Sequence, residues 1–165
     1  MKSKKINTKD LINKIEKVAK ARIASQHVVS LADFREAVKK EEPRVILVIE
    51  DDETMRMALK RIFEAEGYVT KLAADATALS EVLDDTPIDL ILMDVGLPWV
   101  NGFELAQLLK ENKDLKGIPL VFVSGKASEE DMKQAFEIGA DDYIRKPFDV
   151  EKLRKTVRTL LKLNE

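Results

Sequence analysis

Carboxylates follow two short apolar runs of the sequence. Residues 45–49 lead into an acidic run, 50–52, and residues 90–93 lead into Asp94. A short apolar run that ends in polar and turn-forming residues is typical of a strand buried on both faces of a parallel sheet. Because open α/β sheets place ligands at the carboxyl ends of their strands, we expect both acidic groups to line one pocket.

A hydroxyl and an ammonium group follow two later runs that also read as strands. Ser124 follows residues 119–123, and Lys146 follows residues 142–145. Carboxylates held close together repel one another, so a proton or a cation must neutralise some of them. Oxygen ligands without His or Cys favour Mg²⁺. With Ser124 and Lys146 facing the metal, the set predicts phosphoryl transfer to a carboxylate, which forms an acyl phosphate.

The elements that must position these groups alternate along the chain from Arg44 onward. Segments with apolar residues at helical spacing separate the strand-like runs, and Asp52, Asp75 and Ser128 with Asp131 are expected to cap helices. Five strands alternating with five helices predict an α/β fold with a doubly wound parallel sheet. The predicted strands are 45–49, 69–73, 90–93, 119–123 and 142–145.

Length and composition indicate a globular protein with one main core. The chain has 165 residues, of which 45% are hydrophobic and 35% charged, and it contains no cysteine, which excludes disulfides and thiolate metal sites. No apolar run is long enough to span a bilayer, and the Lys-rich start lacks the apolar core of a signal peptide. We therefore expect a cytoplasmic protein without membrane insertion.

The first forty residues differ in charge from the rest. Residues 1–42 carry 11 Lys or Arg against 6 Asp or Glu, whereas the remainder carries 17 against 24. Apolar residues at helical spacing predict two amphipathic helices that end near Lys40, and Pro43 closes the segment. The lysines are mixed with acids and lack interleaved aromatics, which favours a solvated helix face over direct nucleic-acid binding. We expect a helical extension, 1–42, for docking or self-association, including a homodimer, and a main domain, 43–165.

Four motifs in order make residues 44–163 resemble the receiver domain of two-component response regulators. The resemblance is to a single-domain, chemotaxis-regulator-like member and implies a flavodoxin-like sheet with strand order 2-1-3-4-5. The motifs are Ile46–Asp52, Leu92-Met93-Asp94 with Leu97-Pro98 and Asn101-Gly102, Val123-Ser124-Gly125, and Gly139–Phe148 with its Lys146-Pro147-Phe148 ending.

The resemblance implies a metal site built on the acidic residues. Asp94 would be the phosphoacceptor and a ligand of Mg²⁺. Asp51 would bind the ion directly, Glu50 mostly through water, and the backbone carbonyl of Gly96 would complete the protein ligands. Asp52 is not expected to be a ligand.

The resemblance also implies the residues that respond to phosphorylation. Lys146, with a cis bond to Pro147, would hold the phosphoryl oxygens, and Ser124 would donate its hydroxyl to them. Tyr143 would be the aromatic switch that turns inward as Ser124 moves. Lys126, like Gly96, would occupy a position that controls how water reaches the acyl phosphate.

Two further side chains leave alternatives open. Trp99 is either an anchor for a partner or a cover for its loop. His27, the only histidine, could in principle donate a phosphoryl group, but a surface role is favoured.

The expected function is that of a response regulator phosphorylated on Asp94 by a histidine kinase or a phosphotransfer protein. Since the chain ends soon after the last predicted helix, output is expected through protein contacts of the last strand and helices or of the N-terminal helices. The protein would catalyse only its own phosphoryl transfer and autodephosphorylation. The alternatives are a phosphorelay intermediate that passes the group to another histidine, a phosphorylation-independent binding module, and a metal-dependent phosphatase.

Overall fold

The computed structural model divides the chain into two compact units, Met1–Glu42 and Pro43–Glu165. In the first unit, the two expected helices fall almost entirely outside the described residues, and so does His27. The described residues are Ile12, Asn13 and Ile15, which are helical, and residues 42–85 and 87–164.

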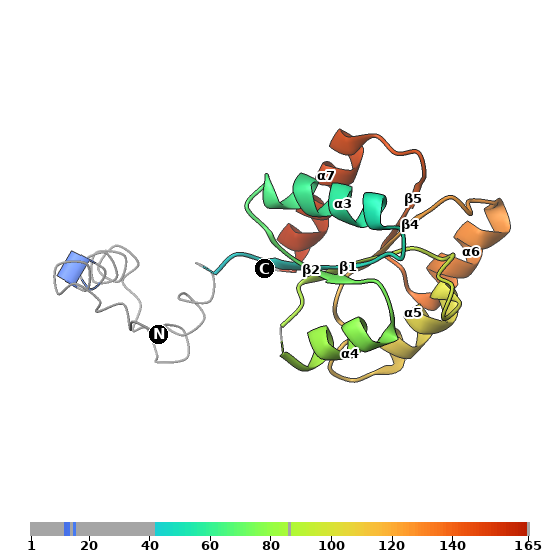
Figure 1. Ribbon diagram of the computed structural model, residues 1–165, viewed down its shortest axis with the longest axis horizontal. Coiled ribbons are helices and arrows are strands. Elements are labelled where there is room, and N and C mark those ends of the chain that lie inside the picture. Colours follow the sequence, from blue (N-terminus) through green and yellow to red (C-terminus); the bar gives the residue numbers. More distant parts are fainter. Residues whose placement is uncertain (1–11, 14, 16–41, 86, 165) are drawn as a thin grey trace. The chain divides into compact units, whose positions relative to one another are not determined.

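The second unit is a five-stranded parallel sheet with helices on both faces (Figure 1). The strand order is β2-β1-β3-β4-β5, which confirms the doubly wound, flavodoxin-like prediction. In chain order the elements are β1 (Val45–Ile49), α3 (Glu53–Glu64), β2 (Val69–Ala73), α4 (Ala76–Asp85), β3 (Leu90–Met93), α5 (Gly102–Glu111), β4 (Leu120–Ser124), α6 (Glu129–Ile138), β5 (Asp142–Arg145) and α7 (Val150–Leu163).

Only the fourth strand differs from its predicted bounds. It begins at Leu120 rather than Pro119 and includes Ser124. Proline has no N–H to donate to a strand ladder, so Pro119 precedes the strand and contributes only its carbonyl, which accepts from the N–H of Ile91 at 2.9 Å.

The central strands are apolar along their length because they face a core on each side. In β1, Leu47 and Ile49 pack into one cluster of buried side chains, and Ile46 and Val48 pack into the other. This alternation follows the period of two in a strand. Figure 1 shows α3 and α7 over one face of the sheet and α4 and α5 over the other.

Side-chain caps lie at the start of helices that follow the strands. The side chain of Asp52 accepts a hydrogen bond from the N–H of Met55 at 2.7 Å, and Ser128 and Asp131 form a capping box at the start of α6. Both caps were predicted from the sequence. Among the described residues, no helix combines the length and the apolar character needed to cross a membrane.

Candidate functional site

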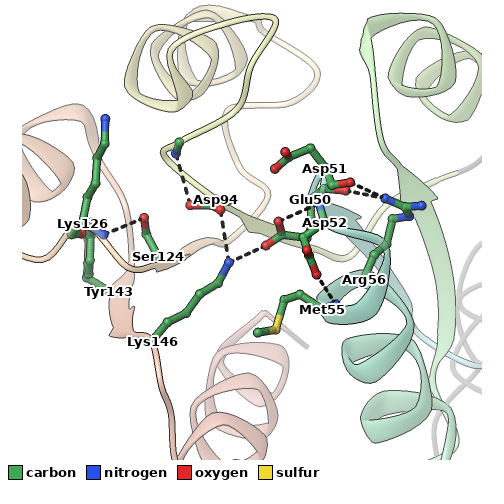
Figure 2. Close-up of polar contacts among 11 residues, drawn as sticks. Glu50, Asp51, Asp52, Met55, Arg56, Asp94, Ser124, Lys126, Tyr143 and Lys146 are labelled. Atoms are coloured by element: carbon green, nitrogen blue, oxygen red, sulfur yellow. Dashed lines mark hydrogen bonds and ion pairs between the residues drawn. The ribbon is translucent and has the colours of Figure 1, made fainter.

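The carboxyl ends of four parallel strands bring the predicted site residues together (Figure 2). Ile49 of β1 pairs with Met93 of β3, so the residues that follow them, Glu50 and Asp94, leave the sheet side by side. The sheet's parallel register therefore creates the pocket from residues that are far apart in the sequence.

Three carboxylates gather at this edge as predicted. Glu50, Asp51 and Asp94 each offer one oxygen, and these oxygens all lie within 4.8 Å of one another. Glu50 is only 2% exposed, whereas Asp51 is open to solvent. Three hard oxygen donors of this kind suit a divalent cation such as Mg²⁺. The Gly96 N–H donates to Oδ1 of Asp94 at 3.1 Å, and metal binding by the Gly96 carbonyl stays a prediction.

The ammonium group of Lys146 joins two of the acids. Its Nζ lies 2.6 Å from Oε2 of Glu50 and 3.1 Å from Oδ2 of Asp94. The Lys146 side chain is 17% exposed, so both ion pairs are largely shielded from water. The bond from Lys146 to Pro147 is cis, as predicted.

The surroundings of these groups change their pKa values in different directions. Burial raises the pKa of Glu50, and Lys146 opposes this rise. Burial alone would also raise the pKa of Asp94, but the Ser124 hydroxyl, the Gly96 N–H and Lys146 together lower it. Burial alone would lower the pKa of Lys146, yet Glu50 and Asp94 raise it. At neutral pH Asp94 is therefore a carboxylate and Lys146 an ammonium.

Ser124 and Tyr143 meet at the loop that follows β4. Ser124 is 1% exposed, and its Oγ accepts from the Lys126 N–H at 3.2 Å. The Tyr143 ring is buried, and its hydroxyl donates to the carbonyl of Lys126. The ring thus already lies inward in this structure, packed 5.7 Å from Phe122 between ring centres. Arg145 makes a second hydrogen bond to this loop, because its Nη2 donates to the Ala127 carbonyl at 3.0 Å.

Arg56 is a site neighbour that sequence reasoning missed. Its Nη1 donates to the backbone carbonyls of Glu50 and Asp51, at 3.0 Å in each case (Figure 2). An arginine at this place in a helix looks like ordinary surface charge in the sequence. Only its position just after the acidic run could have drawn attention to it.

Gly102 was recognised as part of a motif, but its packing role was not. A Cβ at this position would lie 2.5 Å from the carbonyl oxygen of Asp94 and 2.6 Å from Cα of Val95. These are backbone atoms that cannot rotate away. Only glycine lets the start of α5 approach the Asp94 backbone this closely.

Trp99 covers its own loop. Its indole N–H donates to the Ala74 carbonyl at 3.2 Å, and its ring packs against the core cluster that contains Phe103. The bond joins the loop after β3 to the loop after β2. Of the two alternatives for Trp99, the structure supports loop cover.

A doubly wound sheet of this order, with an acidic pocket and a lysine at its carboxyl edge, defines a CheY-like receiver fold. The family model of the response regulator receiver domain matches residues 46–158, and the chain belongs to this family. The acidic pocket described above lies within the matched segment.

Sequence similarity to curated proteins supports this assignment. The chain is 42% identical to the aerobic respiration control protein ArcA of Escherichia coli (strain K12) over 116 residues, which are 70% of this chain and 48% of ArcA. The chain thus spans about half the length of the curated relatives it matches.

Solved structures show the same fold. The chemotaxis protein CheY4 of Vibrio cholerae is 26% identical, with a TM-score of 0.66 over 72% of this chain and 99% of that one. The receiver domain of the sensor histidine kinase PA1611 of Pseudomonas aeruginosa PAO1 is 22% identical, with a TM-score of 0.65 over 73% of this chain and 99% of its own. That domain holds a magnesium ion in its active site cleft, but at this identity the likeness to our chain establishes the fold alone.

Proposed function

We propose that the domain accepts a phosphoryl group on Asp94 from the phosphohistidine of a histidine kinase or a phosphotransfer protein. The observation that carries the proposal is the position of the Asp94 carboxylate, 3.1 Å from the Lys146 ammonium and grouped with Glu50 and Asp51. This combination offers a nucleophile, a cation for the phosphoryl oxygens and a set of metal ligands. It favours phosphoryl acceptance over a binding module that works without phosphorylation.

The proposed reaction forms one bond and breaks another. A carboxylate oxygen of Asp94 attacks phosphorus, and the P–N bond of the donor breaks. The electron pair of that bond stays on the imidazole, which leaves as the neutral base because its other nitrogen carries the proton. The lowered pKa of Asp94 keeps the nucleophile ionised, and Lys146 neutralises charge on the transferred oxygens.

The acids of the pocket fit Mg²⁺. Three carboxylates and one ammonium leave a formal charge of −2, which a divalent cation balances. We propose Asp51, Asp94 and the Gly96 carbonyl as its direct protein ligands, with Glu50 bound mostly through water. When bound, the ion would supply positive charge at the phosphoryl oxygens. Glu50 would be freed for this role as Lys146 moves toward the phosphoryl group.

Ser124 and Tyr143 are the proposed route from the pocket to the surface. The Ser124 hydroxyl would donate to a phosphoryl oxygen. Movement of the side chain toward that oxygen would break the bond that its Oγ accepts from the Lys126 N–H and would move the loop that Tyr143 and Arg145 hold. Output would then pass by protein contacts through β5 and the neighbouring helices, where Phe136 and Val150 are exposed apolar side chains. In this proposal the only acyl phosphate that the domain hydrolyses is its own.

The test is phosphorylation with a small acyl-phosphate donor and Mg²⁺, read by intact mass. Wild-type protein should gain one base-labile phosphoryl group, and Asp94→Asn should gain none because an amide is not a nucleophile here. Asp52→Asn is the matched control: it changes a neighbouring acid in the same way, and asparagine caps a helix as well as aspartate. Equal labelling of wild type and Asp94→Asn would contradict the assignment.

A further inference from the structure

Arg56 makes an unusual pair of contacts at the edge of the acidic pocket. It lies near the start of α3, and one nitrogen, Nη1, bridges the carbonyl oxygens of Glu50 and Asp51 at 3.0 Å each (Figure 2). These are two successive carbonyls of the turn that joins β1 to α3. Their residues provide two of the three grouped carboxylates.

The turn has few other restraints on this side. The N–H of Glu50 still bonds to the sheet, through the Ala73 carbonyl at 3.2 Å, but the chain then leaves the ladder. The N–H of Asp52 donates to Oε1 of Glu50 at 3.1 Å, and Asp52 caps the helix. The guanidinium group of Arg56 supplies the donor that the two turn carbonyls would otherwise take from water.

Holding the carbonyls also fixes the side chains of the same residues. In Figure 2 the guanidinium lies on one side of the turn, while Asp94 and Lys146 lie on the other. The two carbonyls and two of the grouped carboxylates belong to the same residues, so a displacement of this turn as a whole would move Glu50 and Asp51 relative to Asp94. We infer that Arg56 is a positioning residue that holds this turn in the form that binds a divalent cation, an inference that rests on the proposed function of the pocket.

The positive charge of Arg56 has the opposite effect on Mg²⁺ affinity from its proposed positioning role. A cation near an acidic pocket disfavours a second cation, so loss of the charge alone would tighten Mg²⁺ binding. Salt screens interactions between charges, with a Debye length of about 8 Å at an ionic strength of about 0.15 M, so the titration buffer reduces this repulsion. Loss of a group that orients metal ligands typically weakens metal affinity by about 10- to 100-fold. The positioning effect should therefore dominate.

The experiment is calorimetric titration of the full chain with Mg²⁺ at about 0.15 M salt. Arg56→Met should weaken binding about tenfold relative to wild type. Arg56→Lys should restore part of the affinity, because its single ammonium can still reach a turn carbonyl. Arg61→Met is the matched control: it removes an exposed arginine from the same helix and should leave the affinity within about twofold of wild type, as expected for a screened surface charge.

Circular dichroism at the titration temperature separates positioning from a general loss of structure. Both Arg56 variants should be folded there, so weaker binding by a folded protein would be a local effect. If Arg56→Met does not fold, Arg56→Gln, which is also neutral and too short to bridge both carbonyls, gives the same decision.

Two results would overturn the inference, and they are distinguishable. If wild type binds Mg²⁺ and a folded Arg56→Met or Arg56→Gln protein binds it as tightly or more tightly, Arg56 has no positioning role, while the proposed function stands. If wild type itself binds no Mg²⁺, the metal site of the proposed function fails together with the inference.

Discussion

The ammonium of Lys146 lies closer to Glu50 than to the proposed nucleophile Asp94, at 2.6 Å against 3.1 Å. Glu50 is almost fully buried, so in this arrangement Lys146 is the main counter-charge of a carboxylate that water cannot solvate. In this arrangement Lys146 therefore contributes mainly to the stability of the fold, in addition to its proposed role in phosphoryl transfer. Its two roles can be separated by experiment.

Lys146→Met should destabilise the metal-free protein at neutral pH by roughly 3 kcal/mol, because it leaves Glu50 buried without its partner. A carboxyl group with a raised pKa costs stability above that pKa, and the cost disappears as the pH falls and the group is protonated. The loss should therefore shrink in acid. Urea unfolding of wild type and variant at neutral and acid pH measures both effects. Lys133→Met, which removes an exposed lysine, is the control, and an equal loss in both variants would contradict the prediction.

The pH dependence of Mg²⁺ binding should follow Glu50. Burial raises the pKa of Glu50 above the ordinary value of a glutamate, whereas the Ser124 hydroxyl, the Gly96 N–H and Lys146 lower the pKa of Asp94 despite its burial, so Glu50 is protonated first as the pH falls. As the pH falls, affinity should therefore begin to weaken above the ordinary pKa of a glutamate, where Asp94 is still ionised. Titrations across a pH series should show this in wild type, and Glu50→Gln should bind more weakly but with a flatter profile. An unchanged profile in the variant would mean that another group controls binding.

Gly102→Ala should cost about 1–3 kcal/mol of stability, because its Cβ would overlap backbone atoms of Asp94 and Val95. To relieve this overlap the backbone of Asp94 must move. Because Asp94 is the proposed phosphoacceptor, the rate of phosphorylation should drop as well. Gly117→Ala is the matched control, since a Cβ there meets nothing within 4 Å. Denaturant unfolding and the initial labelling rate test both statements. Similar behaviour of the two variants would show that the start of α5 adapts without cost.

Deletion of residues 1–42 should leave Mg²⁺-dependent phosphorylation intact, because every predicted pocket residue lies beyond Pro43. The deleted segment has an excess of five positive charges and the remainder an excess of seven negative ones, so we expect a change in oligomeric state or in partner binding. Sedimentation and pull-down comparisons of the two proteins test this. If both assays give identical results, the segment has no role in association.

The phosphorylated form should last minutes or longer. Gly96 offers no side chain to orient the attacking water, and the cationic Lys126 can shield the phosphoryl oxygens. Combining Gly96→Asn with Lys126→Glu should speed the decay, and a Cβ at position 96 has room, since its nearest neighbour is Asp94 Oδ1 at 4.0 Å. Lys133→Glu is the control, because it makes the same change of charge at an exposed position outside the pocket. Loss of the wild-type phosphoryl group within seconds, without any phosphatase, would refute the prediction.

The sequence by itself determined the elements of this domain and the chemistry at their ends. Apolar runs of four or five residues predicted the five strands, because a strand buried on both faces must be apolar throughout. Caps such as Ser128 predicted helix starts, because their hydrogen bonds join residues only three apart. The parallel order then placed Asp94 and Glu50 at one edge. All of these follow from short-range rules and from the topology of parallel sheets.

The tertiary structure alone decided how the site residues bond to one another. Lys146 pairs with a carboxylate 96 residues away, and no local pattern reveals that Glu50 is the nearer partner. Arg56 and Gly102 take their roles from contacts with backbone atoms, which every residue type has, so the identity of the contacted residues does not reveal these roles. Tyr143 lies inward because its hydroxyl donates a hydrogen bond to the carbonyl of Lys126, in the loop that follows β4. Contacts with backbone atoms and choices among side-chain rotamers depend on packing in three dimensions, and so they leave no periodic signal in the sequence.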